Sequence, residues 1–139
     1  MTESSRDFEE FMKQREAASS AFVNGDFDPL SRISTQASPA TIFGPKGDCV
    51  QGAEKVNEAN AKASKLFQAG GQNAFEVMHM ASDGNLAYWV GVQRSVVRMQ
   101  GQEQAVPMDL RVTEIFRREN GSWKLMHRHA DRLASEGRE

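Results

Sequence analysis

Apolar residues in the first half of the chain recur three or four positions apart, which is the spacing of amphipathic helices. This spacing predicts one helix over residues 6–24 and another over residues 53–67, with the glycine pair at Gly70 ending the second. Between them, Asp28 precedes a proline, which is a typical helix start and predicts a short helix there.

From residue 73 onward apolar and polar residues alternate, which is the pattern of strands with one buried face. The strands predicted from this alternation are 73–81, 86–99, 105–118 and 122–132. The second is long enough that we expect a bend or bulge near Gly91. A short strand over 40–43 and a turn or hairpin loop over 44–52 precede them. Helices first and strands last indicate an α+β fold, with three N-terminal helices packed on the concave face of a curved antiparallel sheet.

The final two strands meet at Asn120-Gly121, which predicts a two-residue hairpin turn because both central residues of a type I′ turn need positive φ. In that register Glu119 pairs with Ser122, and Glu114 faces His127. A one-residue slip or a bulge would break these pairings. The predicted inward face of the hairpin comprises Leu110, Val112, Glu114, Phe116, Trp123, Leu125, His127, His129 and Asp131.

The composition is typical of one globular domain, with 26% charged and 39% hydrophobic residues in 139. We expect a single domain over 1–139 with an ordered core of about 5–133. A net charge of -2 without a basic cluster argues against nucleic acid as a partner. Cys49 is the only cysteine, and neither a signal peptide nor a membrane-spanning stretch is visible. We therefore expect a cytoplasmic protein without a membrane partner.

Glu114 and His127 form the main catalytic hypothesis. An acid directly across from a histidine holds its tautomer and raises its pKa, which suits acid or base catalysis near neutral pH. His129 or Tyr88 would then orient or polarise the substrate. The alternative is a half-buried polar pair whose members satisfy each other and orient the sheet.

The same histidines are also spaced for metal binding. His127 and His129 would lie about 6.5 to 7 Å apart on one face of a strand, and Asp131 and Glu114 could supply two more ligands. Histidines in this pattern are more often pocket walls or satisfied core residues, so we expect no metal.

A second set of candidates lies on the preceding strand pair. In the register set by an Asp-Gly turn, His79 faces Tyr88 on a side shared with Val90, and this side is predicted to face the core. His79 and Tyr88 would then reach the same pocket as His127. Arg94 lies on the same side, where it could anchor an anionic group or remain a solvated charge.

Three segments carry a family resemblance: FVNGDFDPL, ATIFGPKG and RVTEIFRRENGSWKLMHRHAD. With the order of elements, they resemble the SnoaL-like and ketosteroid-isomerase-like superfamily, whose members share the cone-shaped fold of nuclear transport factor 2. The last segment is similar to the branch that contains the association domain of calcium/calmodulin-dependent kinase II. The resemblance implies a conical pocket, no cofactor and a homodimer.

The resemblance does not extend to steroid isomerase chemistry. The aspartate base of those enzymes falls on Gly44, and their tyrosine falls near Ala18. Steroid isomerase activity is therefore not expected.

Two functions remain open. The first is a small-molecule-binding protein, whose catalytic form would be a cofactor-independent isomerase, dehydratase or related acid/base enzyme acting on a mid-sized, mostly apolar substrate. Its catalytic residues would be Glu114, His127 and His129, and its ligand-binding residues would be Tyr88, His79, Val90, Val112, Asp131 and Arg94. The second is a non-catalytic binding or assembly module with a vestigial pocket. Under either function the other face of the sheet would form the homodimer interface, with Arg111, Thr113, Ile115, Met126 and Arg128.

Overall fold

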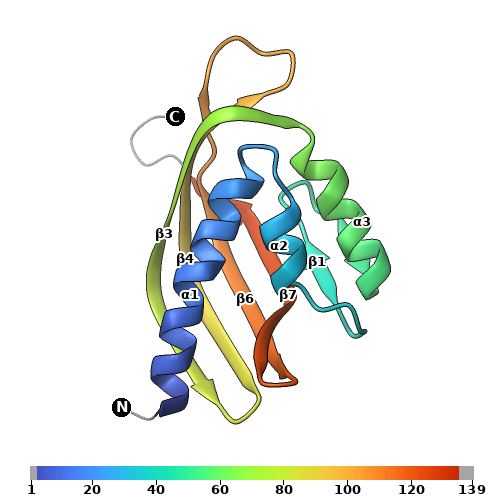
Figure 1. Cartoon of the computed structure of the whole chain (residues 1–139). Helices are drawn as coiled ribbons and strands as arrows, with labels where there is room; N and C mark the ends of the chain where they lie inside the picture. Colours follow the sequence, from blue (N-terminus) through green and yellow to red (C-terminus); the bar gives the residue numbers. More distant parts are fainter. Residues whose placement is uncertain (1–2, 135–139) are drawn as a thin grey trace.

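The computed structural model describes residues 3–134 and shows a curved sheet with three helices on one face (Figure 1). The helices are α1 (Glu3–Phe22), α2 (Asp28–Ile33) and α3 (Ala53–Ser64). The strands are β1 (Thr41–Phe43), β2 (Cys49–Gln51), β3 (Phe67–Asp83), β4 (Leu86–Met99), β5 (Val106–Pro107), β6 (Leu110–Glu119) and β7 (Ser122–Arg132). Within this described range, no helix has both the length and the apolar character needed to cross a membrane. The predicted α+β class is confirmed.

The strands are ordered β2-β1-β7-β6-β4-β3, and the short β5 pairs with β4. The four long strands pair antiparallel, as the alternation predicts. In contrast, β1 joins the sheet parallel to β7, with Ile42 opposite Arg128. The pairing brings the first strand of the chain beside the last one, where both border the candidate site.

The boundary between α3 and β3 differs from the prediction. The helix ends at Ser64, and β3 begins at Phe67 and runs through the glycine pair. Gly70 has a φ of 104°, and the β3–β4 ladder is interrupted between Gln68 and Gln72. The predicted helix end at Gly70 is therefore wrong, because this glycine lies at an irregularity within a strand.

The predicted hairpin turn at Asn120-Gly121 is confirmed. Both residues have positive φ, 50° and 82°, and Glu119 pairs with Ser122. A bulge then changes the register further from the turn, because Phe116 pairs with Leu125 but Ile115 pairs with His127. Met126 is the extra residue on β7.

The bulge reverses the direction of every later side chain on β7. Glu114 pairs with Arg128 rather than with His127, and Thr113 pairs with His129. Paired residues point to the same face of a sheet. We call the face that contacts the helices the inner face and the opposite one the outer face. The alternation predicts Arg128 on the outer face and His127 and His129 on the inner face. Both placements are wrong, since Arg128 lies on the inner face and the two histidines lie on the outer face.

The predicted bulge near Gly91 is confirmed. Val77 pairs with Gly91 and His79 pairs with Val90, so that Met78 is the extra residue on β3. A Cβ atom at Gly91 would overlap the backbone at Glu76. Glycine is therefore required where the two backbones approach closely.

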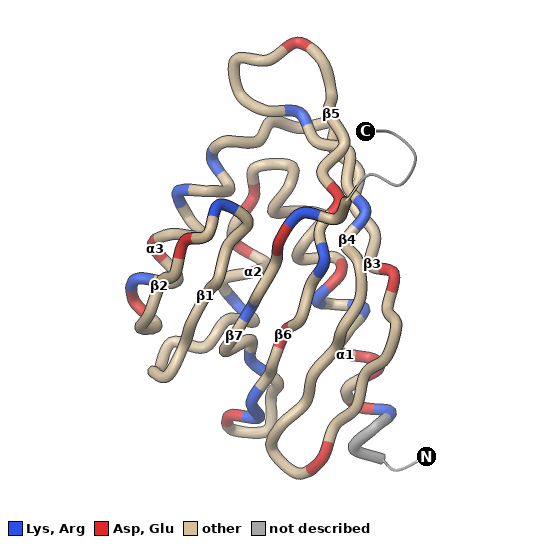
Figure 2. Tube along the Cα trace, turned by 180° about the vertical axis from the view of Figure 1, so that it is seen from behind, with Lys and Arg blue, Asp and Glu red and all other residues tan. Residues whose placement is uncertain are grey.

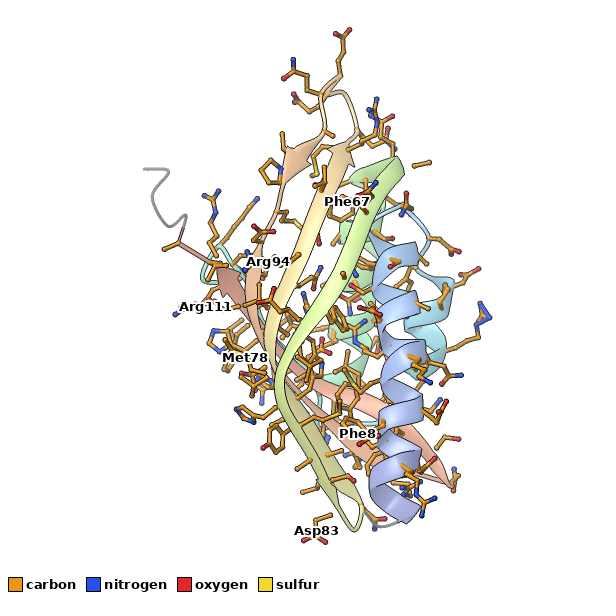
Figure 3. All side chains as sticks on the ribbon, turned by 90° about the vertical axis from the view of Figure 1, so that its left-hand side faces the viewer. Phe8, Phe67, Met78, Asp83, Arg94 and Arg111 are labelled. Carbon is orange, nitrogen blue, oxygen red and sulfur yellow. The ribbon has the colours of Figure 1, made fainter. Side chains whose placement is uncertain are left out.

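The main core lies between α1 and the inner face. Phe8 packs edge-on against Trp123, with ring centroids 5.4 Å apart, and Phe11 packs the same way against Phe116 at 5.3 Å. Trp123 is buried, in agreement with its place on the predicted inward face of the hairpin. Figure 3 shows Phe8 between α1 and the sheet, with Met78, Arg94 and Arg111 on the side away from α1.

Candidate functional site

A buried ion-pair network around Glu114 occupies the inner face. Glu114 projects from β6 and its side chain has no exposed area. Arg15 of α1 meets it in a bidentate pair, in which Nε donates to Oε1 at 2.8 Å and Nη2 donates to Oε2 at 2.7 Å. A pair of this kind fixes both the position and the orientation of the guanidinium group. It ties the first helix to the centre of the sheet.

Two further donors complete the coordination of this carboxylate. Trp89 on β4 donates from Nε1 to Oε1 of Glu114 at 2.8 Å, and Arg128 on β7 donates from Nη1 to Oε2 at 2.8 Å. Each carboxylate oxygen therefore accepts two hydrogen bonds, which fills the usual capacity of an ionised carboxylate.

These contacts also determine the charge of Glu114. Burial would raise its pKa, but the charges of Arg15 and then Arg128 outweigh burial, and the pKa falls from 4.5 to about 2. Glu114 is ionised at neutral pH, and its oxygens are already engaged. It is therefore unsuited to the proton transfer predicted for it.

The network continues from Arg128 along the inner face. Arg128 donates from Nη2 to Oε1 of Gln93 at 2.7 Å, and Gln93 donates from Nε2 to Oγ of Ser95 at 3.3 Å. Ser95 in turn donates to Oδ1 of Asn73 at 2.8 Å. Gln93 and Ser95 are both buried. Arg128 is thus held by two fixed acceptors, Glu114 and Gln93.

A cavity of about 250 Å³ lies between the helices and strands β1 and β7. Arg15 and Arg128 both line it, as does Ser19, which lies one helical turn after Arg15 on α1. The apolar residues of the wall include Phe22, Leu30, Ile42, Val50, Val56, Ala59, Ala63, Phe67, Met108, Leu110, Leu125 and Ala130. The cavity is a mostly apolar space with two arginines in its wall.

The side chains of the two histidines lie on the outer face of the sheet, apart from the ion-pair network around Glu114. Nδ1 of His127 shares a hydrogen bond with Oγ1 of Thr41 at 2.7 Å. The ring of Phe43 packs edge-on against both His127 and His129, with centroid distances of 5.1 and 5.5 Å. His127 belongs to the cavity wall, but the register turns its imidazole away from the side that carries Arg128.

The pKa of His127 also differs from the prediction. Burial lowers this pKa below the ordinary value of 6.5, and the neighbouring His129 lowers it further. Glu114 acts in the opposite direction with a smaller effect, because it lies on the other face. The predicted rise in pKa is therefore wrong, and His127 is neutral at pH 7.

Asp131 also lies on the outer face, where it pairs with Arg111. Nε and Nη2 of Arg111 donate to Oδ1 and Oδ2 of Asp131 at 2.6 and 2.7 Å. The hydrogen bonds from Arg111 lower the pKa of Asp131 below 3.8. Among residues 3–134, no three His, Cys, Asp or Glu side chains are placed to hold a metal ion.

The second set of candidates lies on the outer face as well. His79 Nδ1 and the Tyr88 hydroxyl lie 3.0 Å apart, so their predicted proximity holds, although His79 pairs with Val90 in the ladder. The prediction that this side faces the core is wrong, because alternation from the buried Trp89 places Tyr88 and Val90 outward.

Arg94 and Val112 lie on opposite faces of the sheet. Arg94 forms ion pairs with Glu76 at 3.0 Å and Asp109 at 3.4 Å on the outer face (Figure 3). Val112 is buried on the inner face. Of the predicted site residues, only Val112 and Glu114 thus direct their side chains toward the helices.

Sequence reasoning missed the two arginines of the cavity wall. One signal for Arg15 was available, since it lies at helical spacing from Phe8, Phe11 and Ala18 and so on the buried stripe of α1. A charged residue on such a stripe needs a buried partner. No comparable signal existed for Arg128, because its direction depends on the bulge at Met126.

A family model described as a SnoaL-like domain matches residues 15–132, which is most of the chain. The chain belongs to the SnoaL-like family. The predicted superfamily is thereby confirmed for this SnoaL-like domain. The comparison with curated proteins gave no match.

Solved structures similar to this SnoaL-like domain agree on its fold. A proposed dehydratase of the nuclear transport factor 2-like family from Streptomyces avermitilis is 20% identical with a TM-score of 0.74, covering 94% of this chain and 98% of its own. A nuclear transport factor 2-like superfamily protein from Salmonella enterica is 12% identical with a TM-score of 0.77, covering 96% and 93%.

A third similar structure matches the predicted branch. It is a proposed calcium/calmodulin-dependent protein kinase type II association domain from Thiobacillus denitrificans, 16% identical with a TM-score of 0.68, covering 87% of this chain and 93% of its own. At these identities the similarity concerns the fold, which hosts many functions. The function has to be argued from the site.

Proposed function

We propose that this SnoaL-like domain binds a small, mostly apolar molecule with one polar group in the cavity between its helices and β7. The observation that carries the proposal is an apolar cavity of about 250 Å³ with Arg15 and Arg128 in its wall. Concave, mostly apolar sites with few polar groups are typical of ligand pockets. This volume is slightly below the usual range for drug-sized ligands, which favours a small ligand.

The proposal does not include proton transfer between Glu114 and His127. The two residues point to opposite faces of the sheet, and arginine and tryptophan donors already occupy both oxygens of Glu114. The polar group of the ligand would instead contact the arginines of the cavity wall.

Filling the cavity is expected to weaken binding. Octanol is a suitable neutral probe, and Ala59→Phe places a ring on α3 where Ala59 lines the cavity. Calorimetry should show octanol binding at least about tenfold more weakly to this variant, since two lost methylene contacts at about 0.8 kcal/mol each give that factor.

Ala61→Phe is the matched control for this experiment. Ala61 lies on the same helix with similar burial but outside the cavity wall. This control should bind octanol like the unmodified protein. Absence of octanol binding to the unmodified protein, or equal binding by both variants, would contradict the proposed function.

A second candidate function is assembly through the outer face of the sheet, the side turned toward the viewer in Figure 2. Apolar residues exposed on this face favour it. Phe43, Met78, Leu86 and Val96 are between 40% and 69% exposed. Exposed apolar patches often mark interfaces. We propose that a second copy of the chain covers this face in a homodimer.

Replacing Met78 with lysine should convert such a dimer into monomers, because it buries a charge in the proposed interface. Sedimentation velocity would measure the change. Leu66→Lys is the control, since Leu66 is similarly exposed but lies between α3 and β3. A monomeric unmodified protein, or a dimeric Met78→Lys variant, would contradict this candidate.

A further inference from the structure

The buried network carries more positive than negative charge. Arg15 and Arg128 contribute two cations and Glu114 contributes one anion, and among residues 3–134 no other charged side chain forms a hydrogen bond or ion pair with any of these three. Burial lowers the pKa of Arg128, but an arginine remains protonated in proteins. The network therefore retains one uncompensated positive charge, which is costly to bury.

One donor of Arg15 is also unpartnered. The Arg15 side chain is 3% exposed, and no atom of the described residues accepts a hydrogen bond from its Nη1. Its Nε and Nη2 both face Glu114, so the planar guanidinium directs Nη1 away from that carboxylate. The arginine lines the cavity, and Ser19 lines it one helical turn further along. A buried donor without a partner destabilises the protein unless a ligand satisfies it.

We infer that the polar group of the ligand is a single negative charge, such as a carboxylate, which the guanidinium charges of Arg15 and Arg128 in the cavity wall attract. The inference rests on the proposed function and specifies its ligand class as a small monoanion with an apolar body. An incoming monoanion would neutralise the remaining positive charge. A neutral ligand would leave that charge in place, and a cation would be repelled.

The test compares three probes with the same carbon chain: octanoate, octanol and octylammonium. Calorimetry on the unmodified protein should show octanoate binding about tenfold or more tightly than octanol, because hydrogen bonds to charged groups are worth more than neutral ones. Octylammonium should bind more weakly than octanol. Equal binding of octanoate and octanol would overturn the anion inference while leaving the proposed function intact. No binding by any probe would overturn both.

Two variants test whether the charge of Arg15 causes the preference for octanoate over octanol. Arg15→Gln should lose the preference for octanoate over octanol. Arg111→Gln removes the same charge from an exposed arginine on the outer face and should keep the preference. An equal loss in both variants would overturn the assignment to Arg15. If Arg15→Gln does not fold, the comparison of the three probes on the unmodified protein still tests whether the ligand is an anion.

Discussion

Replacing Glu114 with alanine is expected to lower the free energy of unfolding by about 3 to 5 kcal/mol, the usual cost of removing one partner from a buried ion pair. The variant would leave the buried Arg15 and the partly buried Arg128 without their shared anion, and Trp89 without its acceptor. Urea unfolding followed by fluorescence would measure the loss.

The control for this prediction is Glu10→Ala. Glu10 pairs with Lys13 at 3.2 Å on the exposed side of α1, where its side chain is 74% exposed. Exposed pairs of this kind contribute roughly 0 to 1 kcal/mol, so this variant should unfold almost like the unmodified protein. Similar losses in the two variants would mean that the network around Glu114 does not stabilise the fold.

Acid should destabilise the protein through the same carboxylate. The folded pKa of Glu114 is about 2 and the ordinary value is 4.5, so the unfolded chain binds the proton more readily. Stability from this group is fully present above about pH 4.5 and disappears as the pH falls toward about 2. The difference in pKa corresponds to about 3 kcal/mol at neutral pH.

The acid effect can be separated from that of other carboxylates by comparing unfolding curves of the unmodified protein and Glu114→Gln. The difference in stability between the two should shrink as the pH falls from about 4.5 to about 2. The pKa of His127 is also lowered, so its contribution to stability begins to be lost as the pH falls below 6.5. This loss starts at a higher pH than the loss from Glu114. A difference that stays constant with pH would contradict the assigned pKa of Glu114.

The fold was largely predictable because its signals are local. Alternation marked the long strands, and Asn120-Gly121 marked the final turn, since positive φ at two consecutive residues strongly favours this pair. The helix end predicted at Gly70 is wrong, whereas the bulge predicted near Gly91 is confirmed. Both glycines lie at irregularities of β3 and β4, but the first looked like a helix end because it follows a helical pattern.

The site was less predictable because one inserted residue in β7 changes the face of the sheet to which every later side chain of that strand points. The bulge at Met126 leaves Trp123 and Leu125 on the inner face and exchanges His127 for Arg128 there. A sequence read with strict alternation places the histidines in the pocket. Nothing in the local sequence distinguishes the two registers, because either one puts charged or polar residues on both faces.

The pairing of Arg15 with Glu114 could not be predicted either, because it depends on tertiary packing. The two residues are 99 positions apart, and their contact depends on how α1 packs across the sheet. A buried charge can be suspected from its place on the apolar stripe of a helix, but its partner is known only once the fold is known. The same applies to the cavity, which is bordered by residues from three helices and several strands.

The central claim is that the ligand site lies on the inner face at Arg15 and Arg128, rather than at the histidines of the outer face. Titration of isotope-labelled protein with octanoate, followed by nuclear magnetic resonance, tests it most directly. The account predicts that the Nε–H signals of Arg15 and Arg128 shift as octanoate is added, while the ring signals of His129 and His79 stay in place. Shifts confined to the histidine rings, with unchanged arginine signals, would contradict it.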